Sequence, residues 1–255
     1  LRGAGDHLVW WLTRSTLRWD RGRVLALAPR LNAFQIDACV MASPTSRISP
    51  IDWIREAILP VVPISARMGP RGLYFVWYEW DARAADALAH IDGDSVCSRM
   101  GAISYTPRDD VANEWRVRHR IDAESDKYRL TSVVTGSQST AALESSAVTH
   151  RLCRASETLY GHRVQELSLP AVSDSNTAGL TALWKASAHA MQHRTVTYAC
   201  PRDLAWLNPG DIVTVTDADV GLSSAVALVE AMPWGPLEVL PIQLRLLDQG
   251  EEWAT

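Results

Sequence analysis

His189 and His193 stand four residues apart, a spacing that on a helix can direct two imidazole rings at one metal ion. The residues between them are Ala190, Met191 and Gln192, so the glutamate of a zinc-protease motif is absent and no third ligand is indicated. Surface or helix-capping histidines are the alternative reading, and the sequence favours it. We therefore predict no metal site here.

Carboxylates also occur in pairs. Asp217 and Asp219 precede Gly221 as in a calcium loop, but the further ligands and the distal glutamate do not follow, so a turn at the end of a strand is favoured. Asp109-Asp110 and Glu251-Glu252 lie in polar segments, where paired acids are usually solvated. None of these pairs is distinguished as the acid pair of a glycosidase.

The remaining reactive residues form no catalytic motif. No Gly-x-Ser-x-Gly elbow, phosphate-binding loop or dinucleotide fingerprint is present. The four cysteines are far apart in sequence, without a Cys-x-x-Cys pair, and are expected to be buried free thiols: Cys39, Cys97, Cys153 and Cys200. We predict no catalytic residues, no cofactor and no enzymatic activity, although a catalytic triad assembled in space would escape this search.

Two patterns could serve binding. Arg116, Arg118 and Arg120 would project from one strand face in ~6.6 Å steps and could follow a phosphate backbone. A solvated face paired with carboxylates such as Glu114 is the favoured alternative.

Eleven tryptophans are many for this length, and core packing or subunit contacts explain them better than a carbohydrate platform.

Composition points to an ordinary globular protein, since 47% of the 255 residues are hydrophobic and 21% are charged. The formal net charge of −4 argues against tight binding of nucleic acid or of an anionic membrane. No segment approaches the ~20 uninterrupted apolar residues of a membrane-spanning helix, and we expect a soluble protein made in a cytoplasm. Leu1 in the first position indicates a processed product or part of something longer.

Local patterns predict a mixed first half. A helical hairpin is expected at the start, with Asp6 and Asp20 as N-caps, followed by a strand from Phe34 to Val40. A short helix should begin at Ser49-Pro50, and a strand should leave the turn at 69–72. The clearest hairpin pairs residues 115–121 with 128–134, whereas 81–101 is ambiguous.

The second half should contain helices at 145–160 and 174–191 and strands at 164–169, 195–200, 211–216, 225–231 and 238–247. The longer helix carries an apolar stripe of Leu180, Leu183, Trp184, Ala188 and Met191, with Lys185 and His189 off its centre. The polar patch at 136–140 suggests two domains: a helical hairpin with a mixed α/β part at 1–140, and a helix-decorated barrel at 141–255.

One long segment resembles a known family. Residues 198–217 read Tyr-Ala-Cys-Pro-Arg-Asp-Leu-Ala-Trp-Leu-Asn-Pro-Gly-Asp-Ile-Val-Thr-Val-Thr-Asp, and Val220-Gly221-Leu222 and a strand follow. This segment resembles the hub barrel of bacteriophage tail-tip and baseplate proteins. The stretch 167–194 is similar to the strand-helix-strand lead-in of those proteins. Gly5-Asp6 through Ile36-Asp37 are similar to their inserted helical region, so the resemblance touches about half of the chain.

The resemblance implies an α+β fold with antiparallel β-barrel-like hub domains decorated with helices. It further implies a structural virion protein: a homotrimeric ring between tail tube and tip or spike, with an axial channel for DNA ejection and no stable membrane association. Neighbouring tail proteins and transiently passing DNA would be its partners, and no catalytic residues are carried over. A cell-wall or glycan hydrolase and a carbohydrate-binding module of a tail tip remain as alternatives.

Overall fold

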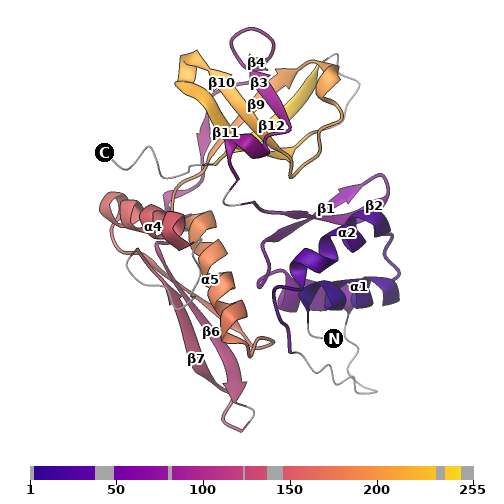
Figure 1. The fold of residues 1–255 in the computed structure, drawn as a ribbon, viewed down its shortest axis with the longest axis vertical. Helices are drawn as coiled ribbons and strands as arrows, with labels where there is room; N and C mark the ends of the chain where they lie inside the picture. Colours follow the sequence, from indigo (N-terminus) through magenta and orange to yellow (C-terminus); the bar gives the residue numbers. More distant parts are fainter. Residues whose placement is uncertain are drawn as a thin grey trace. The chain divides into compact units, whose positions relative to one another are not determined.

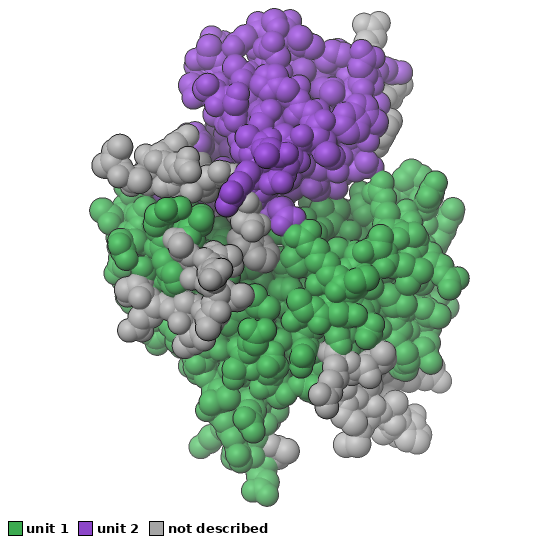
Figure 2. Space-filling model, viewed as in Figure 1, with its two compact units in different colours: residues 1–78, 112–190 green, residues 79–111, 191–255 purple. Residues whose placement is uncertain are grey.

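The computed structural model describes residues 3–37, 49–79, 82–122, 124–136, 146–233 and 239–247 (Figure 1). The chain forms two compact units, coloured separately in Figure 2. Unit 1 comprises Leu1–Tyr78 and Ala112–Ala190, and unit 2 comprises Glu79–Val111 and Met191–Thr255. The units are therefore interleaved in sequence. The linear division into 1–140 and 141–255 stays a prediction, and its polar patch lies almost wholly outside the described residues.

Unit 1 begins with the predicted helical hairpin, α1 (Ala4–Arg14) and α2 (Arg21–Leu31). Asp20 caps α2 as predicted, because its carboxylate accepts a hydrogen bond from a backbone N–H of the first turn at 3.2 Å. The prediction for Asp6 was wrong. This residue lies inside the first turn of α1, where its carboxylate accepts a hydrogen bond from Asn32 Nδ2 at 3.1 Å.

The strand predicted from Phe34 to Val40 does not form over residues 34–37, the part that the structure describes. Gln35 makes one isolated bridge to Gly3, and its N–H donates to Thr177 Oγ1, which belongs to a helix much later in the chain. Phe34 and Ile36 are buried, so the alternation of burial is real. The ladder is missing because these backbone groups bond to helices and to the turn after β8 instead of to a neighbouring strand.

The short helix predicted after Ser49 is α3 (Pro50–Trp53), which continues into one π-helical segment (Ile54–Ile58). Proline occupies the first helical position, where its missing N–H costs no hydrogen bond. The indole of Trp53 stacks on the ring of His7 (centroids 5.3 Å apart) and on that of Trp11 (5.2 Å apart). These contacts fix α3 against α1.

The predicted turn at residues 69–72 joins β1 (Ile64–Gly69) to β2 (Gly72–Trp77). They form a two-stranded antiparallel sheet, of which the sequence predicted the second strand alone. Gly72 has φ = +112°, and a Cβ there would lie 2.3 Å from the Arg18 carbonyl oxygen. Glycine is thus required at this turn.

The second part of unit 1 is a three-stranded sheet in the order β7-β6-β8 with two helices. Its elements match the predicted ranges closely: β6 (Glu114–Asp122), β7 (Lys127–Val134), α4 (Ser146–Tyr160), β8 (Val164–Leu169) and α5 (Ser175–His189). β6 pairs with β7 as the predicted antiparallel hairpin, and β8 runs parallel to β6. α5 packs against β6 and β7, and α4 packs against α5 (Figure 1).

Burial of α5 extends well beyond the predicted apolar stripe. Asp174 caps the helix, since its carboxylate accepts from Thr177 N at 2.7 Å. Thr181 Oγ1 and Trp184 Nε1 both donate to the carbonyl oxygen of Val61, at 2.8 and 2.9 Å. The buried residues of the helix include small and polar ones that a hydropathy stripe omits: Thr177, Ala178, Gly179, Thr181, Ala182, Leu183, Trp184, Ala186 and Ala188.

Unit 2 is built on one curled sheet in the order β3-β10-β11-β12-β9-β4, with β5 also paired to β9 (Figure 1). Every strand pair in it is antiparallel except β3 with β10. Its strands are β3 (Ala89–Asp92), β4 (Ser98–Arg99), β5 (Ser104–Tyr105), β9 (Arg194–Cys200), β10 (Ile212–Asp217), β11 (Leu222–Ala231) and β12 (Leu240–Leu246). Four short 3-10 helices complete the described chain: Ala84–Asp86, Arg108–Asp110, Arg202–Leu204 and Ala218–Val220.

The inner side of the curled sheet holds its own hydrophobic core, which includes Ile91, Tyr198, Val213 and Leu244. The end strands β3 and β4 are joined by one short turn, so the sheet bends back on itself as a half-barrel. The predicted α+β class with a barrel-like, mainly antiparallel sheet is confirmed. No helix in the described part of the chain combines the length and apolarity needed to cross a bilayer.

The approach of α1 to α2 generates a stability prediction. A Cβ on Gly5 would lie 2.0 Å from the Ala28 carbonyl oxygen, so Gly5→Ala should force the helices apart and lower the free energy of unfolding by about 1–3 kcal/mol. Gly22→Ala on α2 is the matched control, because the nearest atom there is 3.6 Å away. It should be neutral or stabilise by up to about 1 kcal/mol. Urea unfolding of both variants checks this, and equal effects would contradict it.

Candidate functional site

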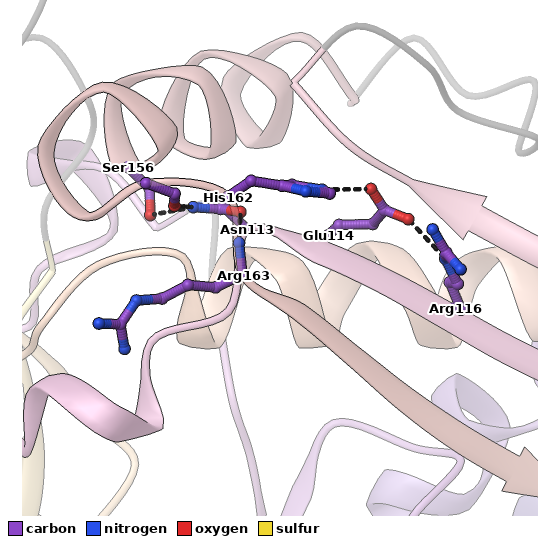
Figure 3. A network of polar contacts seen from close by, with 7 residues as sticks. Asn113, Glu114, Arg116, Ser156, His162 and Arg163 are labelled. Atoms are coloured by element: carbon purple, nitrogen blue, oxygen red, sulfur yellow. Dashed lines mark hydrogen bonds and ion pairs between the residues drawn. The ribbon is translucent and has the colours of Figure 1, made fainter.

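A polar network lies where β6 begins, between α4 and β8 (Figure 3). The buried carboxylate of Glu114 contacts two cationic or polar partners at once. His162 Nε2 is 2.7 Å from one carboxylate oxygen, and Arg116 Nε donates to the other at 2.5 Å. Both oxygens are therefore engaged within the chain.

Asn113, the residue before Glu114, extends the same network (Figure 3). Its Nδ2 donates to Ser156 Oγ at 3.2 Å and to the Gly161 carbonyl at 2.8 Å, while its Oδ1 accepts from Arg163 N at 2.8 Å. Gly161 has φ = +76° and ends α4. Asn113 thus supplies partners for the backbone groups of the turn that leads from α4 into β8.

The electrostatics of Glu114 are those of a structural anion. Burial alone would raise the pKa of its carboxyl, but the hydrogen bonds and charges of His162 and Arg116 outweigh that effect and lower it. The carboxyl groups of Asp92 and Asp122 also have lowered pKa values, chiefly through hydrogen bonds from Ser95 and Ser125. A general acid requires the opposite shift.

The arginine ladder predicted on β6 is largely neutralised inside the chain. Arg116 pairs with Glu114, and Arg118 Nη2 lies 2.5 Å from Glu166 Oε2 on the neighbouring strand β8. Arg120 breaks the pattern, because its φ of +58° is left-handed. Ile121, the next residue, is 37% exposed. The favoured reading, a solvated face paired with carboxylates, is the one the structure supports.

The two histidines singled out by spacing have separate surroundings. His189 lies at the end of α5, with its ring 5.5 Å from the ring of Trp115. His193 belongs to unit 2, where its N–H donates to Thr106 Oγ1. Over the described ranges, no group of three or more His, Cys, Asp or Glu side chains is arranged to hold a metal ion.

Unit 2 has an open hollow of about 560 Å³, lined by residues 93–99 and 199–201 together with Asp217, Asp219 and Val239. Buried Asp217 accepts hydrogen bonds from Tyr198 OH at 2.8 Å and from Arg99 Nη1 at 3.2 Å. Arg99 Nη2 also lies 3.9 Å from Asp219. A guanidinium thus occupies the position that a calcium ion would need.

The turn predicted at Asp217–Gly221 is confirmed. β10 ends at Asp217, a 3-10 helix follows at Ala218–Val220, and Gly221 closes it with φ = +69°. Burial, followed by the hydrogen bond to Asp217, raises the pKa of the Tyr198 phenol. Of the other acid pairs, Asp109 and Asp110 are exposed in a 3-10 helix, whereas Glu251 and Glu252 lie outside the described residues.

The cysteines Cys97, Cys153 and Cys200 are buried free thiols as predicted, and Cys39 lies outside the described residues. Sequence inspection did not reveal that Cys97 and Cys200 come together, because Cys97 directly precedes β4 and Cys200 ends β9, about a hundred residues later. It also missed the pairing of Glu114 with His162. The one available signal was a titratable residue shortly before each of two predicted strands, Glu114 before 115–121 and His162 before 164–169.

Lys185 was predicted to lie off the apolar stripe of α5, and it is half-buried beside two indoles. Its Nζ lies 4.1 Å from the ring centroid of Trp184 and 5.9 Å from that of Trp115. Within the described residues, no carboxylate forms an ion pair with it. Burial therefore lowers the pKa of its amine to about 8.

Residues 56–231 match the family described as putative phage tail protein. This is well over half of the chain, and the chain belongs to that family. The class of protein is thus a structural protein of bacteriophage tails, which places it in the virion, as the sequence resemblance indicated. No curated protein is significantly similar to the chain.

Solved structures of tail proteins are also similar. The chain is 20% identical to the tail protein from Neisseria meningitidis MC58, covering 76% of this chain and 53% of that one, with a TM-score of 0.42. It is 13% identical to prophage tail protein gp18 from Listeria monocytogenes EGD-e. That match covers 81% of this chain and 55% of the other, with a TM-score of 0.46. It is 14% identical to a chain of the virion of a native gene transfer agent particle. That match covers 94% of this chain and 51% of the other, with a TM-score of 0.45. The chain spans only about half the length of each.

Glu114 should stabilise unit 1 through its charge. Glu114→Gln should lower the free energy of unfolding by about 1–2 kcal/mol near neutral pH, because two charge-assisted contacts are weakened. Since folding lowers the pKa below 4.5, the contribution is present above that pH and is lost as the pH falls through the folded-state pKa. Urea unfolding at several pH values checks this.

Glu166→Gln, at a more exposed ion pair, is the control and should lower the free energy of unfolding by less than about 1 kcal/mol. A pH-independent loss in Glu114→Gln would contradict the assignment.

Lys185 should oppose folding while it is charged. Its pKa is about 8 in the folded chain against 10.5 unfolded, so the unfolded chain binds more protons between those values and stability should rise with pH across that window. Lys185→Met should therefore stabilise the chain near neutral pH, by roughly 1–3 kcal/mol, and the gain should vanish above the upper value. Chemical unfolding of both forms measures it. Because Lys127 is the only other lysine, NMR of a Lys127→Arg variant reads the amine of Lys185 directly.

Proposed function

We propose that this tail protein is a hub component, in which three copies form a ring that joins the tail tube to the tip or spike around a passage for DNA. The observation that carries the proposal is the family match over residues 56–231, which includes parts of both compact units. The segment that resembles hub barrels in sequence, 198–231, lies in the curled sheet of unit 2 and within that match. Tail tube, distal tail and tip proteins would be its partners.

Open strand edges support assembly into a ring. Within the described residues, β1 has β2 as its sole neighbour, and β7 has β6. A strand edge with unpaired N–H and C=O groups is a template for pairing with another chain unless it is covered. A ring built of identical copies needs a heterologous contact of this kind, in which one edge of each copy meets a different surface of the next.

The charge distribution suits a passage that does not retain DNA. The net charge is −4, and two of the three arginines on β6 that could follow a phosphate backbone, Arg116 and Arg118, are paired with Glu114 and Glu166. Affinity for DNA grows with the number of free cations that can neutralise phosphates. Internal pairing of these arginines lowers that number.

The pKa values of the carboxyl groups also fit a structural role better than a role in hydrolysis. A glycan hydrolase needs one carboxyl that stays protonated near neutral pH, whereas the shifted pKa values of Asp92, Glu114 and Asp122 are all lowered. A carbohydrate-binding module needs several exposed, coplanar aromatic rings. Among the tryptophans that the structure describes, Trp206 alone is largely exposed. No specific observation on the described residues favours the glycan hydrolase or the carbohydrate-binding module.

The ring is tested on the particle itself. Cryo-electron microscopy of intact virions, with the protein located by an antibody against residues of unit 2, should find three copies around the tail axis at the junction of tube and tip. Light scattering of the purified chain should give three times the monomer mass of 28.2 kDa if the chain alone suffices. Density for the protein along the tail tube, or one copy per particle, would overturn the proposal.

A further inference from the structure

Cys97 and Cys200 face each other across two paired strands of unit 2. The register of β4 on β9 joins Ser98 with Ala199 and Arg99 with Tyr198. One step further along the same register, Cys97 comes opposite Cys200. The two thiols are close enough to hydrogen-bond to each other.

The surroundings of the pair leave it both protected and reachable. Cys97 is 5% exposed and Cys200 is fully buried, and both belong to the core cluster of the curled sheet. Both also line the open hollow of unit 2, through which a small molecule can approach. Cys153 on α4 is equally buried but belongs to unit 1, so it can be replaced without altering unit 2.

We propose that Cys97 and Cys200 are an oxidation site that closes to a cross-strand disulfide when a small disulfide-bonded oxidant, such as oxidised glutathione, enters the hollow. The bond would tie β4, an edge strand of two residues, covalently to β9. The register that pairs Ser98 with Ala199 places the two Cα atoms, one step further along, at about cross-strand spacing, which is within the range that a disulfide spans. This inference does not depend on the hub ring.

The reaction is a double thiol–disulfide exchange. One cysteine gives its proton to solvent, and its thiolate attacks one sulfur of the oxidant, which releases the first small thiol. The second cysteine then loses its proton and attacks the cysteine sulfur of the mixed disulfide, which releases the second small thiol. The protein loses two electrons and two protons, and the oxidant is reduced to two thiols.

Burial sets the rate of this exchange. Desolvation is the main cause that raises the pKa of both thiols, so little thiolate exists near neutral pH and oxidation should be slow. It should accelerate as the pH rises. The same burial should make the finished bond slow to reduce, so the site acts as a lasting clamp and not as a rapid switch. A reducing cytoplasm would keep the pair open, and an oxidising medium would close it.

The test uses a Cys39→Ala/Cys153→Ala variant of the full chain, in which the proposed pair holds the remaining thiols. The reduced protein is incubated with oxidised glutathione near pH 7 and near pH 9. It is then denatured, alkylated and digested for mass spectrometry. The expected product is a peptide pair joined through Cys97 and Cys200, formed several-fold faster at the higher pH, with a melting temperature several degrees above that of the reduced form.

Controls separate this result from general thiol reactivity. Cys97→Ala and Cys200→Ala, made in the same background, should show neither the joined peptides nor the rise in melting temperature. Alanine is small and apolar, so each variant should still fold, and circular dichroism checks that it does. Recovery of both cysteines alkylated after prolonged oxidation, or of each carrying glutathione without a bond between them, would overturn the proposal.

Discussion

The carbonyl oxygen of Val61 accepts two hydrogen bonds from α5, and unit 1 is organised around that contact. The donors, Thr181 and Trp184, are buried, and buried polar groups must find partners. The contact therefore joins the segment after α3 to the helix that covers the three-stranded sheet. Small residues such as Gly179 and Ala182 let other segments approach the helix closely. Two parts of the sequence more than a hundred residues apart thus share one core.

Charged residues serve this architecture in a consistent way. Glu114 joins the end of α4 to the sheet, Glu166 joins β8 to β6, and Arg99 joins β4 to Asp217 near the end of β10. In each case a charged side chain links two elements that are distant in sequence. These ion pairs give geometric specificity more than net stability, because desolvation offsets much of their attraction.

Local signals in the sequence were reliable, and long-range pairing was not. The cap Asp20, the helix starting near Asp174, the β6–β7 hairpin and the turn at Gly221 were predictable, because each depends on residues a few positions apart. β3, β4 and β5 were not, since each gains its partner strand from about a hundred residues away. The same limit hid the Glu114 network and the cysteine pair. Asp6 does not cap a helix, because its carboxylate accepts a hydrogen bond from Asn32 at the end of α2.

The chain crosses between the two units three times, after Tyr78, Val111 and Ala190. During synthesis, unit 1 lacks α5 and β8 until long after its first helices have emerged, and β3 waits for β10. Both units should therefore reach their native pairing late and close together in time. A single proteolytic cut after Val111 would divide both units, because each has residues on either side of that point. Interleaving thus couples the integrity of the two units at this segment.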